Sequence, residues 1–170
     1  MITVRLGALH EAGTQAVLRP VRSDLAGITQ ASRRLEAAAG EQVRKRLEGM
    51  GELPMSSAVL TPGGDLAIGF IIHAVVEAHD EGPSSMGVQR ALINGLRRAR
   101  EWEMTSLAVP PLGLGVGALD PEDAARAMIE VLVDHLGEGE PPHELVIVVE
   151  NPYEEELFRR LVEARRADSA

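Results

Sequence analysis

The stretch of residues 106–121 constrains the fold of this chain more than any other segment. It opens with a short apolar run, continues into a loop with glycine at every second position, and ends at Asp120 and Pro121. Aspartate is favoured at a helix N-cap and proline at the first helical position. The segment therefore predicts a strand, a glycine-rich loop and a helix, in that order.

The loop itself contains Gly113, Gly115 and Gly117. Glycine takes up positive φ without strain and lets a backbone approach a ligand closely. Free backbone N–H groups ahead of a helix N-terminus can hold an anion such as a phosphate. The alternative is a tight strand-to-helix turn that needs glycine for its geometry alone, since acidic residues already meet that helix end. The loop by itself leaves both interpretations open.

Length and charge narrow the class of protein. A chain of 170 residues suits one domain with a sizeable core, which we expect to span residues 1–165, with a frayed terminus at 166–170. The net charge of −9 argues against binding of duplex nucleic acid, which needs a basic face. The sequence contains no cysteine, which excludes disulfides and thiolate metal sites. With no signal-peptide pattern and no apolar run of membrane length, we expect a cytoplasmic protein without a membrane partner.

Apolar patterning predicts strands and helices that alternate along the chain. Strands are expected at residues 2–6, 15–19, 58–61, 68–76, 106–109 and 145–149. Helices are expected from Ser23 or Asp24 to about Leu47 with Gly40 as a candidate break, from Ser84 or Ser85 to about Arg100, from Pro121 to about Leu136, and from Asn151 onward. Pro20 is expected to end the second strand. The predicted fold class is α/β, three-layer α/β/α with a mixed central sheet.

Histidine and glycine patterns that suggest other chemistry can be set aside. On one extended strand His73 and His79 would lie roughly 20 Å apart, at about 3.3 Å per residue, and therefore could not coordinate the same metal ion. His73 sits in an apolar run and is predicted to be a hydrogen-bonded core histidine. The spacing Gly-x-Gly-x-Gly does not match a dinucleotide fingerprint, and no triphosphatase P-loop is present. We expect no metal site and no cofactor.

Several short motifs, taken in order and spacing, resemble the macro domain family, whose fold binds ADP-ribose. Residues 51–54, 58–63 and 71–75 are similar to the family's Gly-x-x-Pro turn, Ala-Val-x-Thr-x-Gly strand and Ile-His-x-Val strand. Residues 111–117 and 121–125 are similar to its phosphate-binding loop and the helix behind it. The resemblance is strongest from about Gly51 to Leu161, and it implies a macro-domain-like fold.

The resemblance also implies site residues. Backbone N–H groups of the glycine-rich loop would face the pyrophosphate of ADP-ribose, and these come from Gly113, Leu114, Gly115, Val116 and Gly117. Tyr153, just past the last strand, is a candidate for stacking on a ring of the ligand. The alternative for Tyr153 is an ordinary surface tyrosine.

The N-terminal third departs from the family pattern. Ala8 stands where the family often has the aspartate that reads the adenine amino group. The segment 19–24 replaces the Asn-Ala-Ala-Asn pattern whose asparagine supports hydrolysis in de-ADP-ribosylating members. Arg19 and Arg22 arise where those polar groups are missing, and they are candidates for a charged clamp on phosphate, with surface arginines as the alternative. Asp24 is a candidate general base or a helix cap.

Three functions follow as hypotheses. The first is binding of ADP-ribose or a related phosphorylated nucleotide through the glycine-rich loop, with a small molecule or an ADP-ribosylated protein as partner. The second is hydrolysis of ADP-ribose from proteins or small esters, for which the expected asparagine and aspartate are not matched. The third is a macro-like interaction domain whose pocket has decayed and which binds no nucleotide.

Overall fold

The strands of this protein pair into one mixed sheet in the computed structural model, which describes residues 1–113 and 119–170. The six strands of these residues are β1 (Ile2–Leu6), β2 (Ala16–Arg22), β3 (Ala58–Pro62), β4 (Phe70–Glu77), β5 (Ser106–Val109) and β6 (Glu144–Val149). Their order across the sheet is β1-β6-β5-β2-β4-β3. Every neighbouring pair is parallel except β3 with β4. The mixed α/β sheet predicted from the sequence is therefore confirmed.

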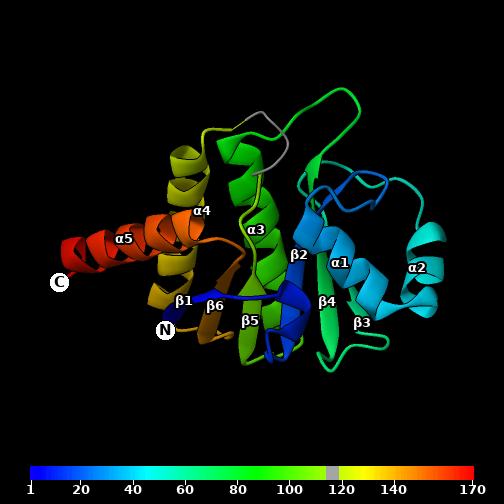
Figure 1. Cartoon of the computed structure of the whole chain (residues 1–170), viewed down its shortest axis with the longest axis horizontal. Coiled ribbons are helices and arrows are strands. Elements are labelled where there is room, and N and C mark those ends of the chain that lie inside the picture. The colour runs from blue at the N-terminus through cyan, green and yellow to red at the C-terminus, as the bar shows by residue number, and fades with distance from the viewer. Residues whose placement is uncertain (114–118) are drawn as a thin grey trace.

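Helices cover both faces of the sheet (Figure 1). They are α1 (Gln30–Ala39), α2 (Glu41–Glu48), α3 (Ser85–Glu101), α4 (Pro121–Gly137) and α5 (Pro152–Asp168), with a short 3₁₀ turn at Leu9–Glu11. Alternate strand residues point to opposite faces. Leu18, Ile72 and Ile147 pack toward α3, α4 and α5, whereas Val17, Ile71 and Val148 pack toward α1 and α2.

Side-chain caps begin the three long helices where the sequence predicts them. The Ser84 hydroxyl accepts from the Gly87 N–H, and the Asp120 carboxylate accepts from the N–H groups of residues 122 and 123. The Asn151 side chain accepts from the Glu154 N–H. Each cap satisfies amides that have no partner within the helix. The last helix continues to Asp168, and Arg166 donates to the Ile2 carbonyl at 2.7 Å. The frayed terminus at residues 166–170 stays a prediction.

The first long helix begins later than the sequence predicts. It starts at Gln30 instead of Ser23 or Asp24, and its N-cap is Thr29. The segment before it turns sharply, because Leu25 has a φ of +71° and the Arg22 N–H donates to the Ala26 carbonyl. The Asp24 carboxylate accepts from the Ala26 N–H in this turn, so it caps no helix. Gly40, with a φ of +94°, separates α1 from α2 and confirms the expected break.

The second strand also runs further than the sequence predicts. It continues through Pro20 to Arg22. Proline usually ends a strand because it cannot donate to the hydrogen-bond ladder. Here β2 pairs with β5 only at Ala16 and Val17, so Pro20 lies beyond that ladder and removes no hydrogen bond from it. The Pro20 carbonyl instead accepts from the buried Ser32 hydroxyl at 2.9 Å. Among the described residues, no helix is both long and apolar enough to cross a membrane.

Candidate ligand-binding site

The helical connections that follow β2 and β5 lie on opposite faces of the sheet. The chain leaves β2 toward α1 on one face and leaves β5 toward α4 on the other. In α/β sheets such a switch point opens a crevice at the carboxyl ends of the strands. The two strands share ladder pairs only at Ala16–Leu107 and Val17–Ala108, near the amino end of β2, and they are unpaired beyond these residues.

A hollow of about 310 Å³ lies at these carboxyl ends. We call it the switch-point hollow, and its lining residues are Ile28, Thr29, Gln30, Ala31, Arg33, Pro110, Pro111, Val148, Glu150 and Glu154. They come from the start of α1 and the two residues before it, from the end of β6, and from the segments that follow β5 and β6. Its volume falls within the range of small-molecule sites, which begins at roughly 300 Å³.

The N-terminus of α1 forms one side of the switch-point hollow. The Thr29 hydroxyl accepts from the Ser32 N–H at 3.1 Å, which fixes the first turn. The N–H groups of Gln30 and Ala31 precede the first bonded amide, so the helix itself provides them with no acceptor. These amides and the helix dipole give this side a positive potential. This side of the hollow therefore suits an anion.

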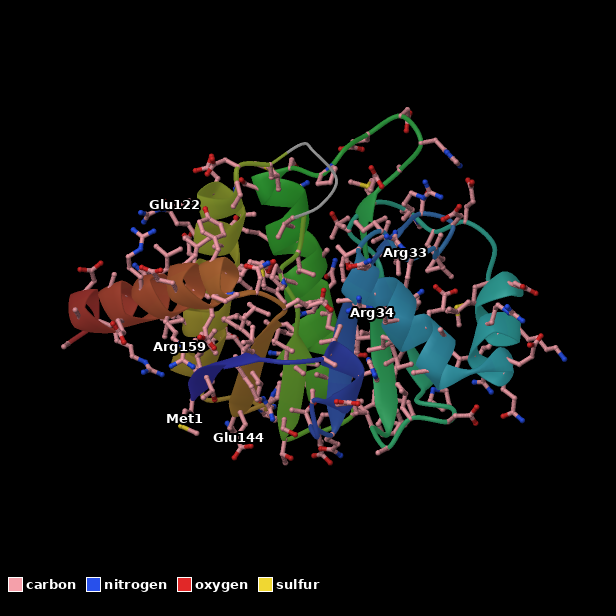
Figure 2. All side chains as sticks on the ribbon, viewed as in Figure 1. Met1, Arg33, Arg34, Glu122, Glu144 and Arg159 are labelled. Carbon is pink, nitrogen blue, oxygen red and sulfur yellow. The ribbon has the colours of Figure 1, made fainter. Side chains whose placement is uncertain are left out.

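Two arginines of α1 extend this positive side (Figure 2). The Arg33 side chain lines the hollow and makes one long contact, 3.5 Å from Nη1 to the Gly27 carbonyl. The Arg34 Nη1 lies 3.1 Å from the Glu150 carboxylate, across 116 positions of sequence. The Arg34–Glu150 pair therefore joins α1 to the end of β6, and Arg33 is the arginine with donors available to a ligand.

The opposite side of the hollow carries carboxylates at the start of α5. Glu154 accepts from the Asn151 side-chain amide at 2.7 Å, while Asn151 accepts from the Glu154 N–H at 2.9 Å. Burial raises the pKa of Glu154; the Asn151 hydrogen bond opposes this rise, and the negative charge of Glu150 adds to it. Because carboxylates accept hydrogen bonds and repel anions, this side suits hydroxyl or amino groups of a ligand.

Arg19 anchors the start of α1, which forms one side of the hollow. It is fully buried, and its Nε donates to His73 Nδ1 at 3.0 Å. Nη2 donates to the Leu25 carbonyl at 2.8 Å, and Nη1 donates to the Ser32 carbonyl and to Glu36 at 3.1 and 3.0 Å. Burial lowers the pKa of Arg19, and the Glu36 charge opposes the change. One guanidinium thus fixes both the turn after β2 and the start of α1.

His73 completes this buried network. Arginine only donates, so His73 Nδ1 must accept from it, and the ring proton lies on Nε2. Nε2 lies 2.9 Å from the Thr61 hydroxyl, to which it donates. Burial lowers the pKa of His73 well below its usual value, and the Arg19 charge acts in the same direction. The predicted hydrogen-bonded core histidine is confirmed.

The residues predicted for the site lie in different places. Gly113 has a φ of +79°, and an added Cβ would lie 2.8 Å from Leu119 Cδ1, so this position requires glycine. Four of the five predicted loop residues, Leu114, Gly115, Val116 and Gly117, fall outside the described residues.

The other three predicted residues do not line the switch-point hollow as described. Arg19 is fully buried, with its hydrogen bonds made to the protein. Arg22 is half-exposed and lies 3.7 Å from the Asp24 carboxylate. Tyr153 is 63% exposed at the first turn of α5. Their roles as ligand contacts remain predictions.

Sequence reasoning missed Thr29, Arg33, Glu150 and Glu154. The sequence signal for Thr29 was present, because a threonine before a run of helix-forming residues is a favoured N-cap. The two glutamates follow the last strand directly, and in a parallel sheet that places them at the ligand edge. Arg33 had no local signal of this kind, since its place depends on where α1 begins.

Comparison with known proteins agrees with this geometry. A family model described as Macro domain matches residues 20–128. A macro domain-containing protein of Caldanaerobacter subterraneus subsp. tengcongensis is 26% identical, covering 92% of this chain and 93% of its own. An O-acetyl-ADP-ribose deacetylase of Escherichia fergusonii is 24% identical, covering 95% and 94%. The Oceanobacillus iheyensis macrodomain with ADP superposes with a TM-score of 0.87 at 19% identity, over 97% of this chain and 91% of that one.

The fold and the hollow define an α/β protein with a crevice at the carboxyl edge of a mixed sheet. The chain belongs to the macro domain family. The resemblance seen in its motifs is thereby confirmed, and the family model also reaches back to residue 20, into the N-terminal segment where the sequence departs from the family pattern.

Proposed function

We propose that this protein binds ADP-ribose, or a related phosphorylated nucleotide, in the switch-point hollow. The observation that carries the proposal is the joint position of the α1 N-terminus and Arg33 on one side of that hollow. A diphosphate fits there because backbone amides, a helix dipole and a guanidinium all favour negative charge. Related macrodomains with ADP bound support the choice of ligand class.

The opposite side of the hollow fits the remaining parts of such a ligand. Glu150 and Glu154 offer acceptors to ribose hydroxyls or to an amino group of the base. They would repel a second phosphate, so the ligand binds with its diphosphate toward α1. The glycine-rich segment from Gly113 to Gly117 remains part of the proposal on sequence grounds, as a second group of amides for the diphosphate.

Titration calorimetry with ADP-ribose, ADP and inorganic phosphate tests this proposal. We expect heat with ADP-ribose, and we expect Arg33→Ala to weaken binding roughly tenfold, because a charge-assisted hydrogen bond contributes about 1.5 kcal/mol. Lys45→Ala, which removes an exposed charge on α2, is the matched control and should change nothing. Gly115→Glu should abolish binding if the loop faces the diphosphate. No heat from any ligand at high micromolar concentration would favour the decayed-pocket hypothesis.

Hydrolysis of an ADP-ribose ester is a second candidate function, and Glu154 is the observation that favours it. Its carboxyl group lines the hollow, and burial raises its pKa, as suits a general base that accepts a proton from water. In this reaction the water oxygen attacks the ester carbonyl, the ester C–O bond breaks, and the sugar hydroxyl leaves with a proton. The deacetylase relative supports the choice of substrate.

Acetate release from O-acetyl-ADP-ribose distinguishes this enzyme from a simple binding domain. We expect Glu154→Gln to remove acetate release while ADP-ribose still binds, because the amide keeps the shape of the side chain and cannot take the proton. Glu155→Gln, one position further along the helix, is the control. A protein that binds ADP-ribose but releases no acetate would be a binding module alone.

A further inference from the structure

The outward face of α3 and α4 carries two rows of opposite charge. Arg90, Arg97 and Arg100 form an exposed row along α3. Glu130 and Asp134 on α4, together with the C-cap residue Glu138, form an exposed row spaced four residues apart on one side of the helix. The two helices run side by side on the same face of the sheet (Figure 1).

A groove of about 350 Å³ separates the two rows. Its walls include Arg97, Arg100, Asp134 and Glu138, and Ile93 lies between the charges with 45% of its surface exposed. Among the ion pairs of the described residues, none joins one row to the other. Asp134 instead lies 3.7 Å from Arg165, and Glu130 accepts from Gln89. The rows thus face outward with little charge compensation from each other.

Hydrogen bonds of Gln89 set the axial position of α3 relative to α4. Its Nε2 donates to the Ala127 carbonyl and to the Glu130 carboxylate, both at 3.2 Å. Both helices return from parallel strands, so they point in the same direction. Counting equal numbers of residues along the two helices from the Glu130 contact makes Arg97 level with Glu138, and counting from the Ala127 contact makes Arg100 level with it, so Glu138 lies level with the C-terminal end of the arginine row.

We propose that this face binds a second copy of the same chain about a two-fold axis parallel to α3 and α4. Rotation about such an axis keeps every residue at its own level and places α3 of one protomer over α4 of its partner. The arginine row of each protomer then contacts the acidic row of its partner, so the dimer contains two such contacts. Two-fold interfaces are self-complementary in this sense, and they are the commonest in soluble oligomers.

The distribution of apolar groups agrees with the same arrangement. Ile93, Leu96 and Val131 line the groove between the charged rows, and of these Ile93 is exposed while the other two are buried, so Ile93 is the apolar side chain that the rotation covers. An apolar centre with charged edges is the usual organisation of protein interfaces. Pairing the arginine row with the acidic row of a second copy brings opposite charges together across the interface.

Sedimentation equilibrium of the full chain tests this proposal. We expect reversible dimers that weaken as salt rises from about 0.05 M to about 0.5 M, because exposed charges are screened. Arg97→Glu and Glu138→Arg should each raise the dimer dissociation constant at least tenfold, about 1.4 kcal/mol, because each creates two like-charge contacts per dimer. Lys45→Glu on α2 makes the same charge change as Arg97→Glu and should leave the dimer intact.

A mixture of the two variants provides the decisive measurement. When Arg97→Glu chains pair with Glu138→Arg chains, both contacts join opposite charges, so the mixture should dimerise as the unaltered protein does. The chain carrying both substitutions should also dimerise. Both side chains are exposed, so circular dichroism should show that the variants fold. An unaltered protein that stays monomeric at high micromolar concentration overturns the proposal, and so does a mixture that fails to restore the dimer.

Discussion

Replacing Arg19 tests most directly the buried network that anchors the start of α1. Arg19→Met keeps much of the volume and removes the guanidinium, which leaves the Leu25 and Ser32 carbonyls and the His73 ring nitrogen without their donor. Each buried acceptor left unpaired costs about 1–3 kcal/mol. Removing one partner of a buried ion pair costs about 3–5 kcal/mol. Glu36 is 28% exposed and recovers part of its hydration, so we expect a loss of about 4 kcal/mol in the free energy of unfolding.

Urea unfolding followed by circular dichroism measures this loss. The matched control is Arg22→Met, which removes a half-exposed arginine from the same strand and should change the free energy of unfolding by no more than about 0.5 kcal/mol. Arg19→Lys should recover little stability, because an ammonium cannot reproduce the planar fork that binds acceptors on several sides. A loss below about 1 kcal/mol for Arg19→Met would refute the reasoning, since unpaired buried acceptors cost more than that.

Three further predictions concern single residues outside the hollow. Because the pKa of His73 is lowered in the folded protein, the unfolded chain takes up the imidazole proton at a higher pH than the folded protein does. The free energy of unfolding should therefore be constant, as far as His73 is concerned, above about pH 6.5 and fall below it, by up to about 1.4 kcal/mol per pH unit. His73→Asn should flatten that part of the urea-measured pH profile, and an unchanged slope would contradict the assignment. Gly113→Ala should destabilise by about 1–3 kcal/mol, measured by thermal melting, because the position combines positive φ with a close neighbour. Asp120→Ala should lower stability by about 1 kcal/mol through loss of the α4 cap, and Asp123→Ala is its control in the same melting assay.

Local sequence signals predicted the regular elements well because their causes are local. The caps at Ser84, Asp120 and Asn151 each act within three residues of themselves. The apolar run of β6 reflects burial on both faces of the sheet. The order and spacing of the family motifs then indicated the macro-domain-like fold, which periodicity alone does not give.

The errors lie where distant residues decide the local structure. α1 begins at Gln30 because Arg19 binds the Leu25 and Ser32 carbonyls, and no helix pattern shows that contact. The residues that line the hollow differ from those predicted for the site for the same reason. Arg33 and Glu154 lie far apart in the sequence and come together only at the switch point. The sequence can indicate that a ligand site lies at the carboxyl edge of the sheet, but the turn after β2 determines which side chains line that site.

The short ladder between β2 and β5 has a mechanical consequence. The two halves of the sheet are joined at Ala16–Leu107 and Val17–Ala108, with Gln15 bonded to Thr105 and Ser106 just outside them. All of these bonds lie near the amino end of β2, and the switch-point hollow lies at the carboxyl ends of the strands, where β2 and β5 are not paired. Widening the hollow to admit a bulkier ligand would therefore bend these two ladder pairs and stretch the exposed Arg34–Glu150 pair, while the hydrogen bonds within each half stay intact.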